Sequence, residues 1–367
     1  MSGTAEHPDL EGFLQDPRFN RIFTLPADPA SNRAAIDVKY TDFGYRNETN
    51  PNEENVLLFF APLMASRMLH VAKDGVAKRH KVRIISLDRP GLGGTSDVEL
   101  EKRIPICRGK FIPRIPRHVE ITLGLLQHLG IQHVSLACHS GGTVYALDML
   151  LHHPEILHPD RPYIAIGAPW ILPSHSHLLS MTITQAIPNV LMAQTDKFAS
   201  FINTLAPALA SSAGVSQTLV GLTKTGPQPT EEDSADTKFE ESLDPKLFKY
   251  IHSEGIRGMS QEALILMQKV KAVEGWGDWV DYDDLVPKLA EALRRAGRRL
   301  SVDVFFAEKD SMVGDATTQG PEWLNKCWEA ERETITYNSN VIPKADHDTI
   351  WSMRLGLPER VIEKISR

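Results

Sequence analysis

The chain has 367 residues, of which 42% are hydrophobic and 24% charged, and its formal net charge at pH 7 is −7. This length and composition are typical of a folded globular protein with a large core and room for an inserted segment. The negative charge and the lack of a dense basic stretch argue against nucleic acid as a main partner.

Neither export nor membrane insertion is predicted by any stretch of the sequence. Residues 1–10 lack the apolar core of a signal peptide, and no apolar run approaches the roughly 18 residues of a membrane span. The three cysteines, Cys107, Cys138 and Cys327, cannot all pair and lack metal-ligand spacing, which favours a reduced compartment. We therefore expect a soluble cytoplasmic protein, with the oligomeric state left open, a dimer included.

Apolar runs and amphipathic stretches alternate along the first half of the chain. The apolar runs are typical of strands buried on both faces, and the stretches between them have helical spacing. We predict strands near 22–25, 36–41, 56–60, 82–87, 134–138 and 163–167, and helices over 67–80, 116–129 and 143–152. This alternation favours an α/β fold with a doubly wound, mostly parallel sheet and helices on both faces.

The alternation stops after residue 171 and resumes near residue 276. Residues 178–222 and 247–273 have roughly helical spacing of apolar residues, whereas residues 226–244 are acidic and contain prolines. Such an acidic stretch is typical of an exposed, disordered loop. We predict that residues 173–280 form a helical cap domain inserted into a core domain made of residues 1–172 and 281–367.

The sheet pattern returns in the last quarter of the chain. We predict strands near 302–307 and 333–338, and helices over 284–296, over 322–330 and from about residue 348 to the end.

The run Cys138-His139-Ser140-Gly141-Gly142 joins a predicted strand to a predicted helix. A serine at such a turn projects from the backbone, and the next amide lies at a helix N-terminus, as in the nucleophile elbow G-x-S-x-G. Cys138 replaces the first glycine of that pattern and is small enough for the close packing that the turn requires. The same run also fits a phosphate-binding turn or a tight connection, so the partners of Ser140 decide between these readings.

A nucleophilic serine needs a base to take its proton and an acid to orient the base. Asp310 and His347 each follow a predicted strand, although an aspartate there is often a helix cap and a loop histidine is usually a surface residue. Because parallel strands end at the same edge of a sheet, we predict that Ser140, Asp310 and His347 form a catalytic triad. Other acids near these loops are less well placed: Asp303, Glu308, Asp346 and Asp348.

Together these motifs resemble the α/β-hydrolase family. The run Asp88-Arg89-Pro90-Gly91-Leu92-Gly93 is similar to a structural turn of that family, and the inserted residues 173–280 stand where the family has its cap. The resemblance implies the α/β-hydrolase fold and a serine hydrolase that needs no metal or organic cofactor.

Ala61-Pro62 occupies the place where many members of the family have His-Gly. The resemblance therefore implies an oxyanion hole formed by the backbone amides of Gly141 and Leu63, with Gly141 favoured further by its place at a helix N-terminus. We expect four residues to contact the substrate: Met64, His139, Leu191 and Met192.

A serine at the nucleophile position argues against epoxide hydrolases and haloalkane dehalogenases, which use an aspartate there. It favours hydrolysis of an ester, lactone or thioester through an acyl-enzyme. The substrate is expected to be a largely apolar small molecule, because the inserted segment is rich in leucine and methionine and has no dense basic cluster. A carbon–carbon bond hydrolase and a ligand-binding receptor with little turnover remain as alternatives.

Overall fold

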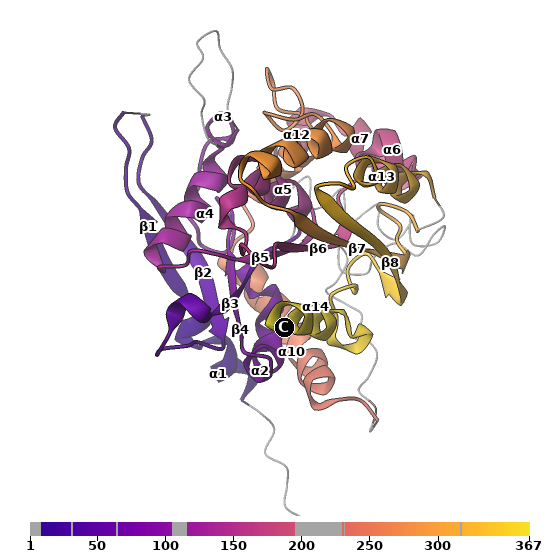
Figure 1. Cartoon of the computed structure of the whole chain (residues 1–367). Helices are drawn as coiled ribbons and strands as arrows, with labels where there is room; N and C mark the ends of the chain where they lie inside the picture. Colours follow the sequence, from indigo (N-terminus) through magenta and orange to yellow (C-terminus); the bar gives the residue numbers. More distant parts are fainter. Residues whose placement is uncertain are drawn as a thin grey trace, which may run out of the picture.

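The computed structural model describes residues 9–30, 32–63, 65–104, 116–194, 230, 232–315 and 318–367. Its centre is an eight-stranded sheet with the order β1-β2-β4-β3-β5-β6-β7-β8 (Figure 1). The strands are β1 (Arg21–Leu25), β2 (Ile36–Gly44), β3 (Asn55–Phe60), β4 (Val82–Leu87), β5 (Ser135–Ser140), β6 (Tyr163–Pro169), β7 (Leu300–Lys309) and β8 (Ile335–Asp346).

Six of the strands, β4-β3-β5-β6-β7-β8, pair in parallel, whereas β1 with β2 and β2 with β4 pair antiparallel. Parallel strands need crossover connections, and helices make them here. The α-helices are α1 (Leu10–Leu14), α2 (Asp74–Arg79), α3 (Leu100–Arg103), α4 (Arg117–His128), α5 (Gly142–His152), α6 (Pro173–Ser176), α7 (Leu179–Ala186), α8 (Asn189–Met192), α10 (Ala235–Glu254), α11 (Met259–Leu266), α12 (Tyr282–Arg295), α13 (Gln319–Glu329) and α14 (Leu357–Ser366). Short 3₁₀ helices are η1 (Pro17–Phe19), η2 (Pro51–Glu53), η3 (Arg67–Lys73), η4 (Pro154–Ile156) and η5 (Met353–Leu355).

The sheet has a hydrophobic core on each face. Alternate residues of β3 divide between the two cores, with Leu58 and Phe60 in one and Leu57 and Phe59 in the other. The first core is covered by α4, α5, α11, α12 and α13, and the second by α1, η3, α2, α10 and α14. Burial on both faces explains why the central strands are continuous apolar runs in the sequence.

This architecture confirms the predicted α/β class with a doubly wound, mostly parallel sheet. The bounds predicted for the last strand and the last helix were wrong, however, because β8 continues to Asp346 and the last helix begins at Leu357. The second half of β8 mixes exposed residues such as Val341 and Lys344 with the buried Ile342 and Ala345, and it contains Pro343, which a strand at the edge of a sheet tolerates. Gly356, with φ +72°, turns the chain into α14.

The acidic stretch was also predicted wrongly where the structure describes it. Residues 226–229 and 231 lie outside the described residues, but helix α10 begins at Ala235 with Ser234 as its N-cap. Glu240 on this helix is buried and forms an ion pair with Lys73, 2.5 Å from Nζ to Oε1. Lys73 comes from a distant part of the chain, so this stabilisation leaves no local signal in the sequence.

The described helices of the predicted cap segment lie on both faces of the sheet. Helix α10 packs against η3 and α1 on the second core, whereas α8 and α11 pack together on the first core. Figure 1 shows α10 beside α2 and α14, and α6 and α7 near α13. Gly255, with φ +105°, ends α10 and divides the predicted helical stretch 247–273 into two helices.

Candidate active site

Ser140 is the last residue of β5 and immediately precedes Gly141, the N-cap of α5. Its φ of +50° is a backbone conformation that non-glycine residues seldom adopt and that clusters at functional sites. Gly142 permits the close approach that this turn needs, because a Cβ there would lie 2.2 Å from the carbonyl oxygen of Phe60 and 2.8 Å from that of Ala61. The sharp turn therefore rests directly on the end of β3.

The structure brings Ser140, His347 and Asp310 together at the carboxyl ends of β5, β8 and β7. His347 Nε2 lies 2.8 Å from Ser140 Oγ, and His347 Nδ1 lies 2.8 Å from Asp310 Oδ2. Because a carboxylate only accepts hydrogen bonds, Nδ1 donates to Asp310, and the neutral ring then accepts the Ser140 hydroxyl proton at Nε2. All three residues are buried, with at most 6% of each exposed.

Asp310 is held in position by the loop that follows β7. Its Oδ1 accepts hydrogen bonds from the backbone amides of Met312 at 2.8 Å and Val313 at 2.9 Å. Both carboxylate oxygens therefore have fixed donors, Oδ1 from the backbone and Oδ2 from His347.

The other acids near these loops have different partners. Asp303 accepts from Tyr163 and Asn338, and Glu308 accepts from the backbone amide of Lys344. Asp346 accepts from the amides of Asp348 and Thr349 within its own turn. The carboxylate in contact with the His347 ring is that of Asp310.

The electrostatics of His347 suit a base that must accept a proton. Burial alone lowers the pKa of this imidazole, but the charge and hydrogen bond of Asp310 outweigh burial, so the pKa lies above its usual value. The imidazolium that would form on proton transfer is therefore stabilised by a carboxylate already in contact with it.

His139 lies beneath the triad with 3% of its surface exposed. Its Nε2 donates a hydrogen bond of 2.7 Å to the backbone carbonyl oxygen of His347. Burial and the neighbouring His347 lower its pKa to about 3, so the ring is neutral at pH 7. The hydrogen bond ties the turn after β8 to the strand that carries Ser140.

The loop after β3 lies against the turn formed by Ser140, Gly141 and Gly142. Leu63 is half-buried in this loop and packs on the first core, and Met64 lies outside the described residues. Arg89 holds the loop in place, because Nη1 donates to the carbonyl oxygen of Ala61 at 2.7 Å and Nη2 to that of Pro62 at 2.8 Å.

Helix α11 covers the first turn of α5. A Cβ on Gly141 would lie 2.5 Å from Leu266 Cδ1, so the Leu266 side chain lies directly on Gly141. The indole Nε1 of Trp170 donates to the carbonyl oxygen of Leu266 at 3.1 Å, which fixes the end of α11. Met192 is fully buried in the same core, and its neighbour Leu191 is half-buried against that core.

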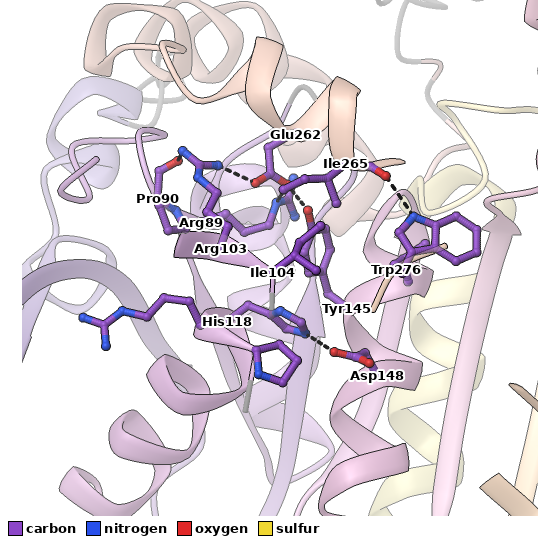
Figure 2. Close-up of a pocket in the computed structure, with 13 residues that line it drawn as sticks. Arg89, Pro90, Arg103, Ile104, His118, Tyr145, Asp148, Glu262, Ile265 and Trp276 are labelled. Carbon is purple, nitrogen blue, oxygen red and sulfur yellow. Dashed lines mark hydrogen bonds and ion pairs between the residues drawn. The ribbon is translucent and has the colours of Figure 1, made fainter. Parts of the chain in front are cut away.

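A small cavity of about 30 Å³ lies beside α5, next to this region. Figure 2 shows Arg89, Arg103, Tyr145 and Glu262 grouped at one part of it, with Trp276 at another. Ser140 is not among the described residues that line the cavity, so this space is separate from the triad.

Within the described ranges, no group of three or more histidine, cysteine or acidic side chains could hold a metal ion. Nor is any helix in this part of the chain long and apolar enough to cross a membrane.

Two residues of this region were not expected from the sequence to bear on the site: Arg89 and Glu262. Arg89 is part of a run that resembles a structural turn of the α/β-hydrolase family, and its contact with Ala61 and Pro62 depends on how β3 and β4 lie side by side. Glu262 reaches the site from the inserted segment, whose packing has no signature in the spacing of residues.

No protein-family model matches the sequence, and no curated protein is similar to it in sequence. Solved structures do resemble the chain. An epoxide hydrolase from Mycobacterium thermoresistibile has a TM-score of 0.55 and 13% identity, with 94% of this chain and 98% of that chain covered. A carboxylesterase structure from Nitrososphaera gargenis has a TM-score of 0.51 and 12% identity, covering 93% and 96%.

An enol-lactonase from Burkholderia xenovorans matches with a TM-score of 0.53 and 13% identity, over 90% of this chain and 97% of its own. These structures share one architecture over most of their length. The chain therefore has the α/β-hydrolase fold, as its motifs predicted.

Proposed function

We propose that the chain is a serine hydrolase that cleaves an ester, lactone or thioester of a largely apolar small molecule through an acyl-enzyme on Ser140. The observation that carries the proposal is the unbroken hydrogen-bond chain from Ser140 Oγ through His347 to Asp310. A serine rather than an aspartate at the elbow favours acyl transfer over epoxide opening. The esterase and lactonase among the similar structures agree with this choice.

In the first half of the reaction, Ser140 Oγ attacks the carbonyl carbon of the substrate while His347 Nε2 takes the hydroxyl proton. The carbonyl oxygen becomes an oxyanion, and the amides of Gly141 and Leu63 are the donors that we assign to it. His347 then gives its proton to the leaving alcohol or thiol as the carbon–oxygen or carbon–sulfur bond breaks. The acyl group remains on Ser140 as an ester.

In the second half, a water molecule gives a proton to His347 Nε2 and its oxygen attacks the acyl carbon. The tetrahedral oxyanion uses the same two amides, and collapse returns the proton to Ser140 Oγ and releases the carboxylic acid. Asp310 stays ionised throughout and stabilises the imidazolium that forms twice in each cycle.

The substrate proposal depends on the surroundings of Ser140. The residue that lies on Gly141 is Leu266, and the half-buried Leu63 and Leu191 pack on the same core. We propose that residues 173–280 act as the cap, with α8 and α11 as the part that covers Ser140. His139, buried and bonded to the His347 backbone, would then touch a substrate only at the base of the site. Cytoplasmic location stays a prediction from the sequence.

The proposal is tested with a fluorophosphonate probe and a panel of acyl esters and thioesters of graded chain length. We expect the probe to label Ser140, and Ser140→Ala to abolish labelling and lower turnover by about 10⁴-fold or more. Ser86→Ala removes another buried serine hydroxyl, which donates to Phe59 away from the triad, and should keep full activity. A Ser140→Ala protein that keeps one tenth of wild-type turnover would refute the assignment, and labelling with negligible turnover on every ester would instead indicate a receptor.

A further inference from the structure

Glu262, on α11, is buried at the centre of a charged cluster beside α5. Its Oε2 lies 2.7 Å from Arg89 Nε, its Oε1 accepts from Arg103 Nη1 at 2.8 Å, and it also accepts from the hydroxyl of Tyr145. Only 1% of Glu262 and 7% of Arg89 is exposed. Figure 2 shows Glu262 between the two arginines, with the Tyr145 hydroxyl directed at its carboxylate.

Each of the three nitrogens of the Arg89 guanidinium lies against a different oxygen atom. Nε faces Glu262, whereas Nη1 and Nη2 donate to the carbonyl oxygens of Ala61 and Pro62. The ring of Tyr145 lies against the guanidinium, with 5.0 Å between Arg89 Cζ and the centroid of the ring. A planar, forked group held on several sides cannot rotate, so it fixes the two carbonyls to which it donates.

These two carbonyls precede the amide that we assign to the oxyanion. The peptide group of Pro62 and Leu63 contains both the carbonyl oxygen that Arg89 holds and the Leu63 N–H. Since a peptide group is planar, fixing its oxygen also fixes the direction of its N–H. The carbonyl oxygen of Ala61 also lies close to Gly142, the residue after the other assigned donor, because a Cβ at Gly142 would be 2.8 Å from it.

Stability alone explains this arrangement poorly, because a buried ion pair gains little net free energy after its desolvation is counted. The inserted segment is also joined to the loop after β4 at its backbone. The amide of Gly93 donates to Gly255 at 3.2 Å, and the amide of Gly258 donates to Gly91 at 2.8 Å. The position of α11 and the position of Arg89 are therefore coupled.

We propose that Arg89 and Glu262 are positioning residues for the oxyanion hole, through which the inserted segment fixes the direction of the Leu63 amide. The inference rests on the proposed function. It assigns the segment a part in the chemistry itself, since α11 supplies the carboxylate that holds Arg89 in the orientation the loop requires.

The test compares Arg89→Lys and Glu262→Gln with the wild type on one ester of the panel. A lysine presents one ammonium group and cannot contact Glu262 and both carbonyls in the geometry of a guanidinium. The value of kcat is calculated per active site, and active sites are counted by titrating Ser140 to completion with the fluorophosphonate. We expect kcat to fall about 10- to 100-fold, while KM changes by less than about threefold. Binding of a trifluoromethyl ketone, which adds to Ser140 and forms an oxyanion, should weaken by the same factor as kcat.

Arg83→Lys is the matched control, because Arg83 is equally buried and contacts two carboxylates, Asp42 and Glu54, but lies away from the loop after β3. We expect it to lower the midpoint of urea unfolding while kcat per titrated site stays unchanged. If Arg89→Lys does not fold, Glu262→Gln carries the test alone, since it is isosteric and leaves Arg89 in place.

The proposal is overturned if both variants lose stability like Arg83→Lys yet keep kcat and ketone affinity within about threefold of the wild type. A wild-type chain that neither labels at Ser140 nor turns over any ester overturns the proposed function as well. The two failures are thus distinguished by the wild type alone.

Discussion

Replacement of Asp310 by asparagine is the sharpest test of how the triad is held. In the wild type Oδ1 accepts from two backbone amides, of Met312 and Val313, and Oδ2 accepts from His347 Nδ1. An asparagine keeps one oxygen, and the two amides require that it take the place of Oδ1. Its NH₂ group must then face His347 Nδ1.

An NH₂ group can only donate, so Nδ1 of His347 must become the acceptor and the ring proton must move to Nε2. Nε2 then faces the Ser140 hydroxyl as a donor and cannot take its proton. Loss of the correct tautomer at such a site costs about 10⁴-fold in kcat, or about 5.5 kcal/mol of activation free energy at 1.36 kcal/mol per factor of ten. We expect Asp310→Asn to show this loss with little change of fold, because every heavy-atom contact has a counterpart.

The assay is the initial rate on one ester, normalised to folded protein by circular dichroism. Asp346→Asn is the matched control, because Asp346 adjoins His347 but accepts only from its own turn, so kcat should stay within a few-fold of the wild type. Glu308→Gln should be equally mild. An Asp310→Asn variant within tenfold of the wild type, or an equal loss in Asp346→Asn, would refute the reasoning.

Three further predictions concern the base, the elbow and the cap. Because Asp310 raises the pKa of His347, kcat/KM should rise with pH through a midpoint above the usual value of about 6.5, and a profile flat from about pH 5 to 9 would contradict the role of His347. Gly142→Ala should lower the free energy of unfolding in urea by about 1–3 kcal/mol and reduce kcat, because the new Cβ would lie 2.2 and 2.8 Å from backbone oxygens. The control Gly75→Ala, in α2, should change neither quantity. Leu191→Trp should change the ranking of acyl chain lengths but leave the labelling of Ser140 nearly unchanged, whereas Val190→Trp, at a position that is 74% exposed, should not change the ranking.

Much of the sheet could be predicted because its central strands are buried on both faces and are therefore visibly apolar. β3 and β5 are examples, since each lies between two cores. The second half of β8 could not be predicted in this way. It lies at the edge of the sheet, has exposed side chains such as Val341, and contains a proline, so neither its apolar content nor its alternation indicates a strand.

The constellation of Ser140, Asp310 and His347 could be proposed from the sequence because its geometry follows from topology. Each residue follows a strand, and the strands β5, β7 and β8 are parallel members of one sheet, so their ends meet at one edge. The arrangement around Arg89 follows from no such rule. It depends on which residue of α11 faces α5, and α11 comes from a segment whose path the spacing of residues does not determine.

The loops after β7, β8 and β3 are each fixed by a contact that exists before a substrate arrives. Two backbone amides hold Asp310, His139 holds the backbone of His347, and Arg89 holds the carbonyls beside Leu63. Donors and charges that are already oriented cost no reorganisation when the oxyanion forms. Such electrostatic stabilisation of the transition state is the largest single contribution to the rate enhancement of many enzymes. In the function that we propose, the surface that discriminates among substrates is formed by α11, whose Leu266 lies on Gly141, and by α8, which packs against α11. Selectivity for the acyl group should accordingly change with substitutions on these two helices, while the rate constant for a small, unselective probe should change only with those that reach Arg89.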